Sequence, residues 1–98
     1  MPKYFMTWEV DPTRVPTDLK ERSALWGGML EMIKQQMKDG TTTEWGSFVG
    51  EGRGYSVGEQ SEKELVKTLQ QFYPYVTFEV HRVLTVDEMA EVIKSLGE

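Results

Sequence analysis

The sequence contains no cysteine, and only one of its 98 residues is a histidine. The absence of cysteine excludes disulfide bonds, thiolate zinc sites and thiol nucleophiles. A chain of this length fits one domain, residues 1–98, and buries only about two-thirds of the surface that its unfolded form exposes. Because no covalent or metal cross-link of that kind adds stability, we expect the chain to associate with itself.

Positive charge is also scarce. Sixteen acidic residues outnumber eleven basic ones, which gives a formal net charge of −5. Such a chain repels phosphate backbones and anionic lipids unless its basic residues gather on one face. No apolar run approaches the length of a membrane span, and the N-terminus lacks the apolar core of a signal peptide. We therefore expect a cytoplasmic protein that binds neither nucleic acid nor membrane.

Alternating apolar residues predict four strands. In residues 3–10, Tyr4, Met6 and Trp8 occupy every second position, which is the period of a strand with one buried face. Similar patterns predict strands over 43–49, 54–60 and 75–84. The glycine-rich turn at residues 50–53 joins the second and third strands into a hairpin.

Helical spacing and capping residues predict three helices. Residues 17–39 have an amphipathic pattern that ends at Gly40. A second helix follows the capping pair Ser61 and Glu64 and stops before Pro74, and a third follows the capping pair at residues 85 and 88. With right-handed crossovers, this order predicts a ferredoxin-like α+β fold with a four-stranded antiparallel sheet, spatial order 4-1-3-2, and an extra C-terminal helix. The first two helices would cover one face of the sheet and leave the other bare.

The runs Glu44-Trp45-Gly46 and Phe72-Tyr73-Pro74, together with the capped terminal helix, carry a family resemblance. The whole layout resembles small proteins of the dimeric α+β barrel superfamily, which includes muconolactone isomerases and cofactor-free antibiotic-biosynthesis monooxygenases. The resemblance implies a homodimer in which two sheets face each other, with a small organic ligand between sheet and helices or within the barrel, and no cofactor. No catalytic motif of the superfamily is matched residue for residue, so no particular activity transfers.

Three ionisable residues are candidates for catalysis on the bare face. His81 and Glu79 lie two positions apart on one predicted strand, and Glu9 comes from the strand expected beside it. An imidazole between two carboxylates suits proton abstraction next to a carbonyl or lactone, with His81 or Glu79 as the base. Isomerase or cofactor-free oxygenase chemistry is the activity that this arrangement would serve.

Five further residues are candidates for ligand binding. Phe5 and Thr7 share the predicted face with Glu9, and Tyr55 belongs to the neighbouring hairpin strand. Arg53 is placed to reach an anionic ligand at a barrel mouth. Trp45 has free space beside it because Gly46 follows, although its pattern does not settle which face of the sheet it occupies.

Several other interpretations remain. The same polar residues would also suit a wet dimer interface in a non-catalytic interaction or regulatory module. A metal site is disfavoured because one histidine and two glutamates supply three ligands without helical spacing. The run 50–54 joins two strands and so lacks phosphate-loop geometry, and the RNA-binding motif that begins at Arg53 is not continued. A register slip of one residue would exchange the two faces of a strand.

Overall fold

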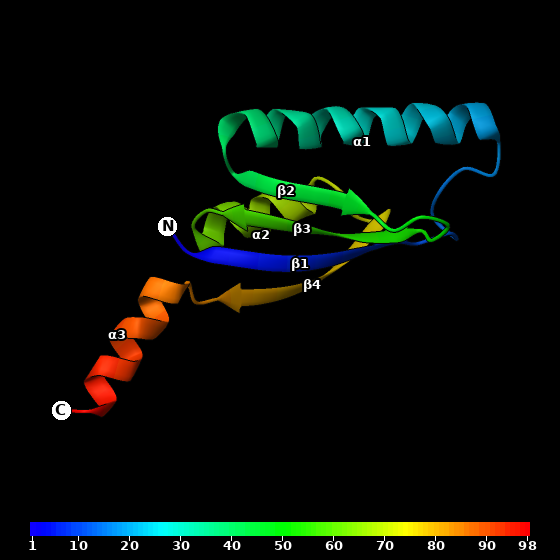
Figure 1. Cartoon of the computed structure of the whole chain (residues 1–98). Coiled ribbons are helices and arrows are strands. Elements are labelled where there is room, and N and C mark those ends of the chain that lie inside the picture. Colours follow the sequence, from blue (N-terminus) through cyan, green and yellow to red (C-terminus); the bar gives the residue numbers. More distant parts are fainter.

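The computed structural model describes residues 1–98 and has the predicted order of elements (Figure 1). The strands and helices, in chain order, are β1 (Lys3–Val10), α1 (Leu19–Asp39), β2 (Thr42–Ser47), β3 (Arg53–Glu59), α2 (Glu62–Gln70), β4 (Val76–Val83) and α3 (Val86–Leu96). The first helix begins two residues later than expected because Asp18 is its N-cap, and the Asp18 side chain accepts a hydrogen bond from the Glu21 amide. None of the helices is both long and apolar enough to cross a bilayer.

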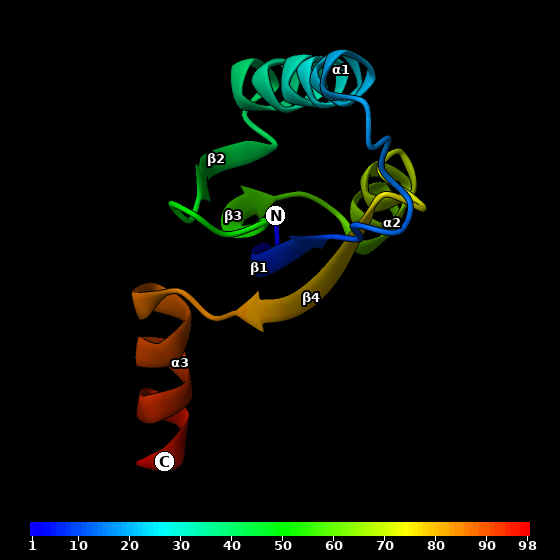
Figure 2. The ribbon, with the colours of Figure 1, turned by 90° about the vertical axis from the view of Figure 1, so that its right-hand side faces the viewer.

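The four strands form one antiparallel sheet in the order β2-β3-β1-β4, which is 4-1-3-2 when read from the other edge. Trp8 of β1 pairs with Gly54 of β3 on one side and with Phe78 of β4 on the other. Figures 1 and 2 show α1 and α2 on the same side of the sheet. The α+β architecture is therefore confirmed and is consistent with a ferredoxin-like layout.

The core between sheet and helices is small. Tyr4 and Met6 of β1 pack with Leu65 of α2, and Leu69 lies against them. Helix α1 adds only Met29 to the buried set, although its apolar stripe was expected to pack on the sheet. Only 10 of the 98 residues are buried, so much apolar surface stays exposed in the single chain.

Helix α3 projects away from the sheet on the side opposite α1 (Figures 1 and 2). Its start is fixed by a complete capping box between Thr85 and Glu88 and by an ion pair from Arg82 to Glu88, 3.2 Å long. None of its residues is buried. The projection gives the chain extents of 61 × 25 × 21 Å and a radius of gyration of 16.2 Å, whereas a globular chain of this length has about 12.6 Å.

Candidate functional site

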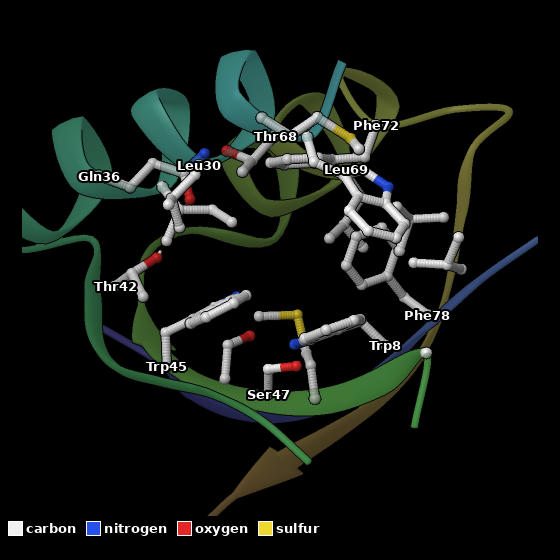
Figure 3. Close-up of a pocket in the computed structure, with 18 of the residues that line it drawn as sticks. Trp8, Leu30, Gln36, Thr42, Trp45, Ser47, Thr68, Leu69, Phe72 and Phe78 are labelled. Carbon is white, nitrogen blue, oxygen red and sulfur yellow. Dashed lines mark hydrogen bonds between the residues drawn. The ribbon is translucent and has the colours of Figure 1, made fainter. Parts of the chain in front are cut away.

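A cavity of about 300 Å³ lies between the sheet and the two helices that cover it (Figure 3). Its walls are mainly apolar and come from both layers. The sheet contributes Met6, Trp8, Trp45 and Phe78, the helices contribute Trp26, Leu30, Ile33 and Leu69, and the turn after α2 contributes Phe72. Helix α1 does not close onto the sheet along its whole length, and Met29 is its only buried residue. The space that remains between helix and sheet is the cavity.

Two tryptophans form the floor of this cavity. The Trp8 and Trp45 rings are stacked with centroids 5.3 Å apart and planes inclined by 9°, and Figure 3 shows both from the edge beneath α1. Gly54 faces Trp8 across the β1–β3 pair, and a Cβ atom at Gly54 would collide with the Trp8 ring. A residue without a side chain at position 54 therefore allows Trp8 to lie flat on the sheet.

Polar side chains are few in the cavity, and most of them are uncharged. The Thr42 hydroxyl donates to the Gln36 amide oxygen over 3.2 Å, and the Thr68 hydroxyl donates to the Gln60 amide oxygen over 3.4 Å. Trp8 Nε1 is buried without a hydrogen-bond partner. These groups would orient a ligand, because an apolar pocket gains specificity from a small number of placed polar groups.

Glu51 is the one charged residue that lines the cavity. It belongs to the β2–β3 turn, half exposed, and its carboxylate pairs with Arg53 Nε at 3.6 Å. The rest of the lining has no formal charge.

The outer face of the sheet holds the predicted proton-transfer residues. His81 Nε2 lies 3.1 Å from Glu79 Oε1, with the two side chains 55% and 73% exposed. Glu9 is on the same face but pairs across the strands with Thr77 and Arg53 rather than with Glu79. The structure therefore brings His81 and Glu79 together and places Glu9 in a hollow that Thr7, Arg53 and Glu79 also line.

A row of aromatic rings crosses this outer face. Tyr55 stacks between Phe5 and Phe48, with centroid distances of 6.2 Å to each. The Tyr55 hydroxyl donates to Glu44 Oε1 over 2.7 Å, and this hydrogen bond raises the pKa of the Tyr55 phenol because ionisation would break it beside a carboxylate. No group of three or more histidine, aspartate or glutamate side chains lies close enough together to hold a metal ion.

A family model matches residues 2–97, almost the whole chain. The chain belongs to the family described as "Domain of unknown function (DUF3303)". No curated protein matches the chain.

The predicted site residues of this DUF3303 chain lie on two different faces of the sheet. Trp45 stacks on Trp8 in the cavity on the helix side. The other predicted residues lie on the outer face: Phe5, Thr7, Glu9, Arg53, Tyr55, Glu79 and His81. Trp26 of α1 is 44% exposed at the cavity, with the Arg22 guanidinium 5.6 Å above its ring.

The family resemblance implies a ligand either between sheet and helices, where the cavity lies, or within a barrel, and the residues themselves hold part of the signal that favours the first. Trp8 and Ser56 were on predictable strand faces, and the glycine at position 54 pointed to a bulky neighbour on the paired strand. The height of α1 above the sheet, which creates the space, leaves no pattern in the sequence.

Proposed function

We propose that this protein is a homodimer that binds a small organic molecule in the cavity between its helices and its sheet. The observation that carries the proposal is the cavity of about 300 Å³ with its floor of stacked Trp8 and Trp45. A concave, mostly apolar space with a few polar groups is typical of small-molecule sites, and this volume is at the lower end of their range.

The driving force for ligand binding is the free energy gained when the apolar cavity walls are removed from water. Trp26 and Leu30 stand at the cavity and are 44% and 39% exposed. Covering apolar surface stabilises the covered state by about 25 cal/mol for each Å². A ligand that fills the cavity would cover these walls and hold α1 against the sheet, so binding would raise the melting temperature.

The test is a thermal-shift and calorimetric screen of lactones, quinones and other small carbonyl compounds against the purified chain. Leu30→Trp would fill the cavity from α1 and abolish binding of every hit. Glu31→Trp places the same ring on the next, exposed position of α1 and leaves binding unchanged. The proposal fails if no compound binds the wild-type chain, or if Leu30→Trp binds as well as Glu31→Trp.

The homodimer part of the proposal is supported by an excess of exposed surface. The single chain exposes 7160 Å², whereas a folded monomer of 11.3 kDa exposes about 5,700 Å². The surplus of about 1,400 Å² is larger than the roughly 800 Å² that each partner buries in a standard interface. Exposed apolar side chains on the outer sheet face and on α3 contribute to this surplus, and a second copy of the chain would cover both.

A second candidate function is proton transfer by His81 and Glu79 beneath the second copy. The 3.1 Å contact between His81 Nε2 and Glu79 Oε1 supports it, because a carboxylate that orients an imidazole is a recurring acid–base arrangement. For a carbonyl compound that binds on the outer face of the sheet, product formation followed by NMR would stop in His81→Gln and Glu79→Gln. Glu62→Gln, at an exposed position of α2 away from this face, serves as the control. Binding without turnover would leave the interaction or regulatory module as the better description.

A further inference from the structure

We infer that the ligand of the cavity is an uncharged, flat molecule with a hydrogen-bond acceptor, an inference that rests on the proposed binding function and specifies its chemistry. Three separate properties of the cavity lead to this class: the charge of its lining, the shape of its floor and the kind of hydrogen-bonding groups that it leaves unused.

The lining excludes a charged ligand. No lysine, arginine or histidine lines the cavity, and its single carboxylate, Glu51, stands on the β2–β3 turn and already pairs with Arg53. A charge that is moved out of water needs an opposite charge or several hydrogen bonds, and otherwise strongly opposes binding. Either sign of charge would lack a partner among the apolar walls and uncharged amides and hydroxyls.

The floor favours a flat ligand. Trp8 and Trp45 lie nearly parallel, at 9°, and form one extended aromatic surface on the sheet (Figure 3). Leu30 and Ile33 of α1 line the cavity from above. Aromatic rings attract one another in offset stacks, so a planar ligand would extend the stack of the two indoles and present its other face to the aliphatic side chains.

Three unused polar groups of the cavity can only donate a hydrogen bond. The amide oxygens of Gln36 and Gln60 are already occupied by the hydroxyls of Thr42 and Thr68. Their amide nitrogens form no hydrogen bond within the chain, and Trp8 Nε1, which can only donate, is buried without a partner. A carbonyl or ether oxygen on the ligand would satisfy these donors, while the hydroxyls of Ser47 and Ser56, which also line the cavity, can either donate or accept.

Three flat compounds of nearly the same shape separate the charge requirement from the acceptor requirement. 2-Acetylnaphthalene is flat, neutral and carries an acceptor, 2-ethylnaphthalene lacks the acceptor, and 2-naphthoate carries a charge. Calorimetry on the full chain should give the ketone an affinity about tenfold above that of the hydrocarbon, the size of one neutral hydrogen bond. The carboxylate should bind about a hundredfold more weakly than the ketone, because its charge is desolvated without a partner.

Two variants test whether Gln36 and Trp8 donate the hydrogen bonds that favour the ketone over the hydrocarbon. Gln36→Leu should remove most of the advantage of the ketone over the hydrocarbon, while Gln35→Leu, one position along α1 and exposed, retains it. Trp8→Phe keeps an aromatic floor but deletes Nε1, and should reduce the same advantage in a chain whose sheet is otherwise unchanged.

The outcomes distinguish this inference from the function on which it rests. Equal binding of ketone and carboxylate, or of ketone and hydrocarbon, would overturn the inference while the cavity remains a binding site. The same holds if other compounds from the screen bind and none of these three does. If nothing binds the wild-type chain, both the inference and the proposed function fail.

Discussion

Gly54 and Gly46 determine where the large aromatic side chains of the sheet lie, one on each face. A Cβ atom at Gly54 would enter the space of the Trp8 ring, and a Cβ atom at Gly46 would stand 2.6 Å from Cε1 of Tyr55. Real Cβ atoms do not approach neighbours so closely, so each glycine permits an aromatic ring to lie across the neighbouring strand. The cavity floor and the outer aromatic row therefore depend on two residues without side chains.

Gly54→Ala should destabilise the protein by about 1–3 kcal/mol, because the new methyl group displaces Trp8 or the carbonyl of Gly46. Urea unfolding followed by circular dichroism measures the change. Gly27→Ala is the contrasting control: a Cβ atom there meets nothing within 4 Å, and alanine in a helix interior gains about 1 kcal/mol over glycine. A Gly54→Ala chain as stable as the wild type would show that Trp8 does not lie across this glycine.

The Tyr55–Glu44 hydrogen bond predicts a pH dependence in the alkaline range. The bond raises the pKa of Tyr55 in the folded chain, so its stabilising effect is present below the pKa of an ordinary tyrosine and disappears as the pH rises through the raised value. A titration of phenolate absorbance should show a step above the ordinary range of a tyrosine, which belongs to Tyr55. Glu44→Gln should return that pKa toward its ordinary value, and Tyr55→Phe should delete the late step; persistence of the step in Tyr55→Phe would contradict the assignment.

At the scale of elements, the short helices α2 and α3 begin in the same way but differ in how much they bury. Both begin at a hydroxyl N-cap, Ser61 and Thr85, whose side chain accepts a backbone amide hydrogen bond. Helix α2 also buries Leu65 in the core, whereas α3 buries no residue. An isolated helix of eleven residues is marginal in water, so α3 depends on its capping box and on whatever covers its apolar side.

Thr85→Ala should accelerate amide hydrogen exchange across α3 about fivefold, which corresponds to a lost cap of about 1 kcal/mol. Ser61→Ala is the matched variant: it should lower global stability by a similar amount while α2 stays protected, because Leu65 holds it to the sheet. Mass-spectrometric exchange of the two segments measures both effects. Unchanged exchange in α3 would mean that its order does not come from the cap.

The sequence predicts elements well where a local pattern encodes them. Strict alternation placed β1 at Lys3–Val10, and the capping pair at Thr85 placed the start of α3. The spacing of two residues also placed His81 beside Glu79. The face of Trp45 could not be predicted, because β2 has little apolar alternation and its register shifts between Thr42 and Glu44. Glu9 stands opposite Thr77 and diagonal to Glu79, because cross-strand pairing, not strand pattern, decides which residues are opposite each other.

The shape of the whole molecule follows from one short connection. β4 ends at Val83 and α3 begins at Val86, so the chain has little length in which to turn the helix back toward the sheet. On α3, Val86, Ile93 and Leu96 are 86%, 63% and 79% exposed, and Phe5 is 37% exposed on the sheet face. Apolar surface of this extent on two parts of one monomer indicates an interface.

Sedimentation equilibrium should therefore give a mass near twice 11.3 kDa at micromolar concentration. Phe5→Lys, on the outer sheet face, and Ile93→Lys, on α3, should each shift the mass toward the single chain, because a lysine ammonium would lie unpaired in the interface. Val49→Lys is the control, since Val49 stands fully exposed in the β2–β3 turn and its replacement should leave the mass unchanged. A wild-type mass near 11.3 kDa at every concentration would refute the homodimer. If Phe5→Lys alone dissociates it, two sheets face each other without α3; if Ile93→Lys alone does so, the pairing runs through α3.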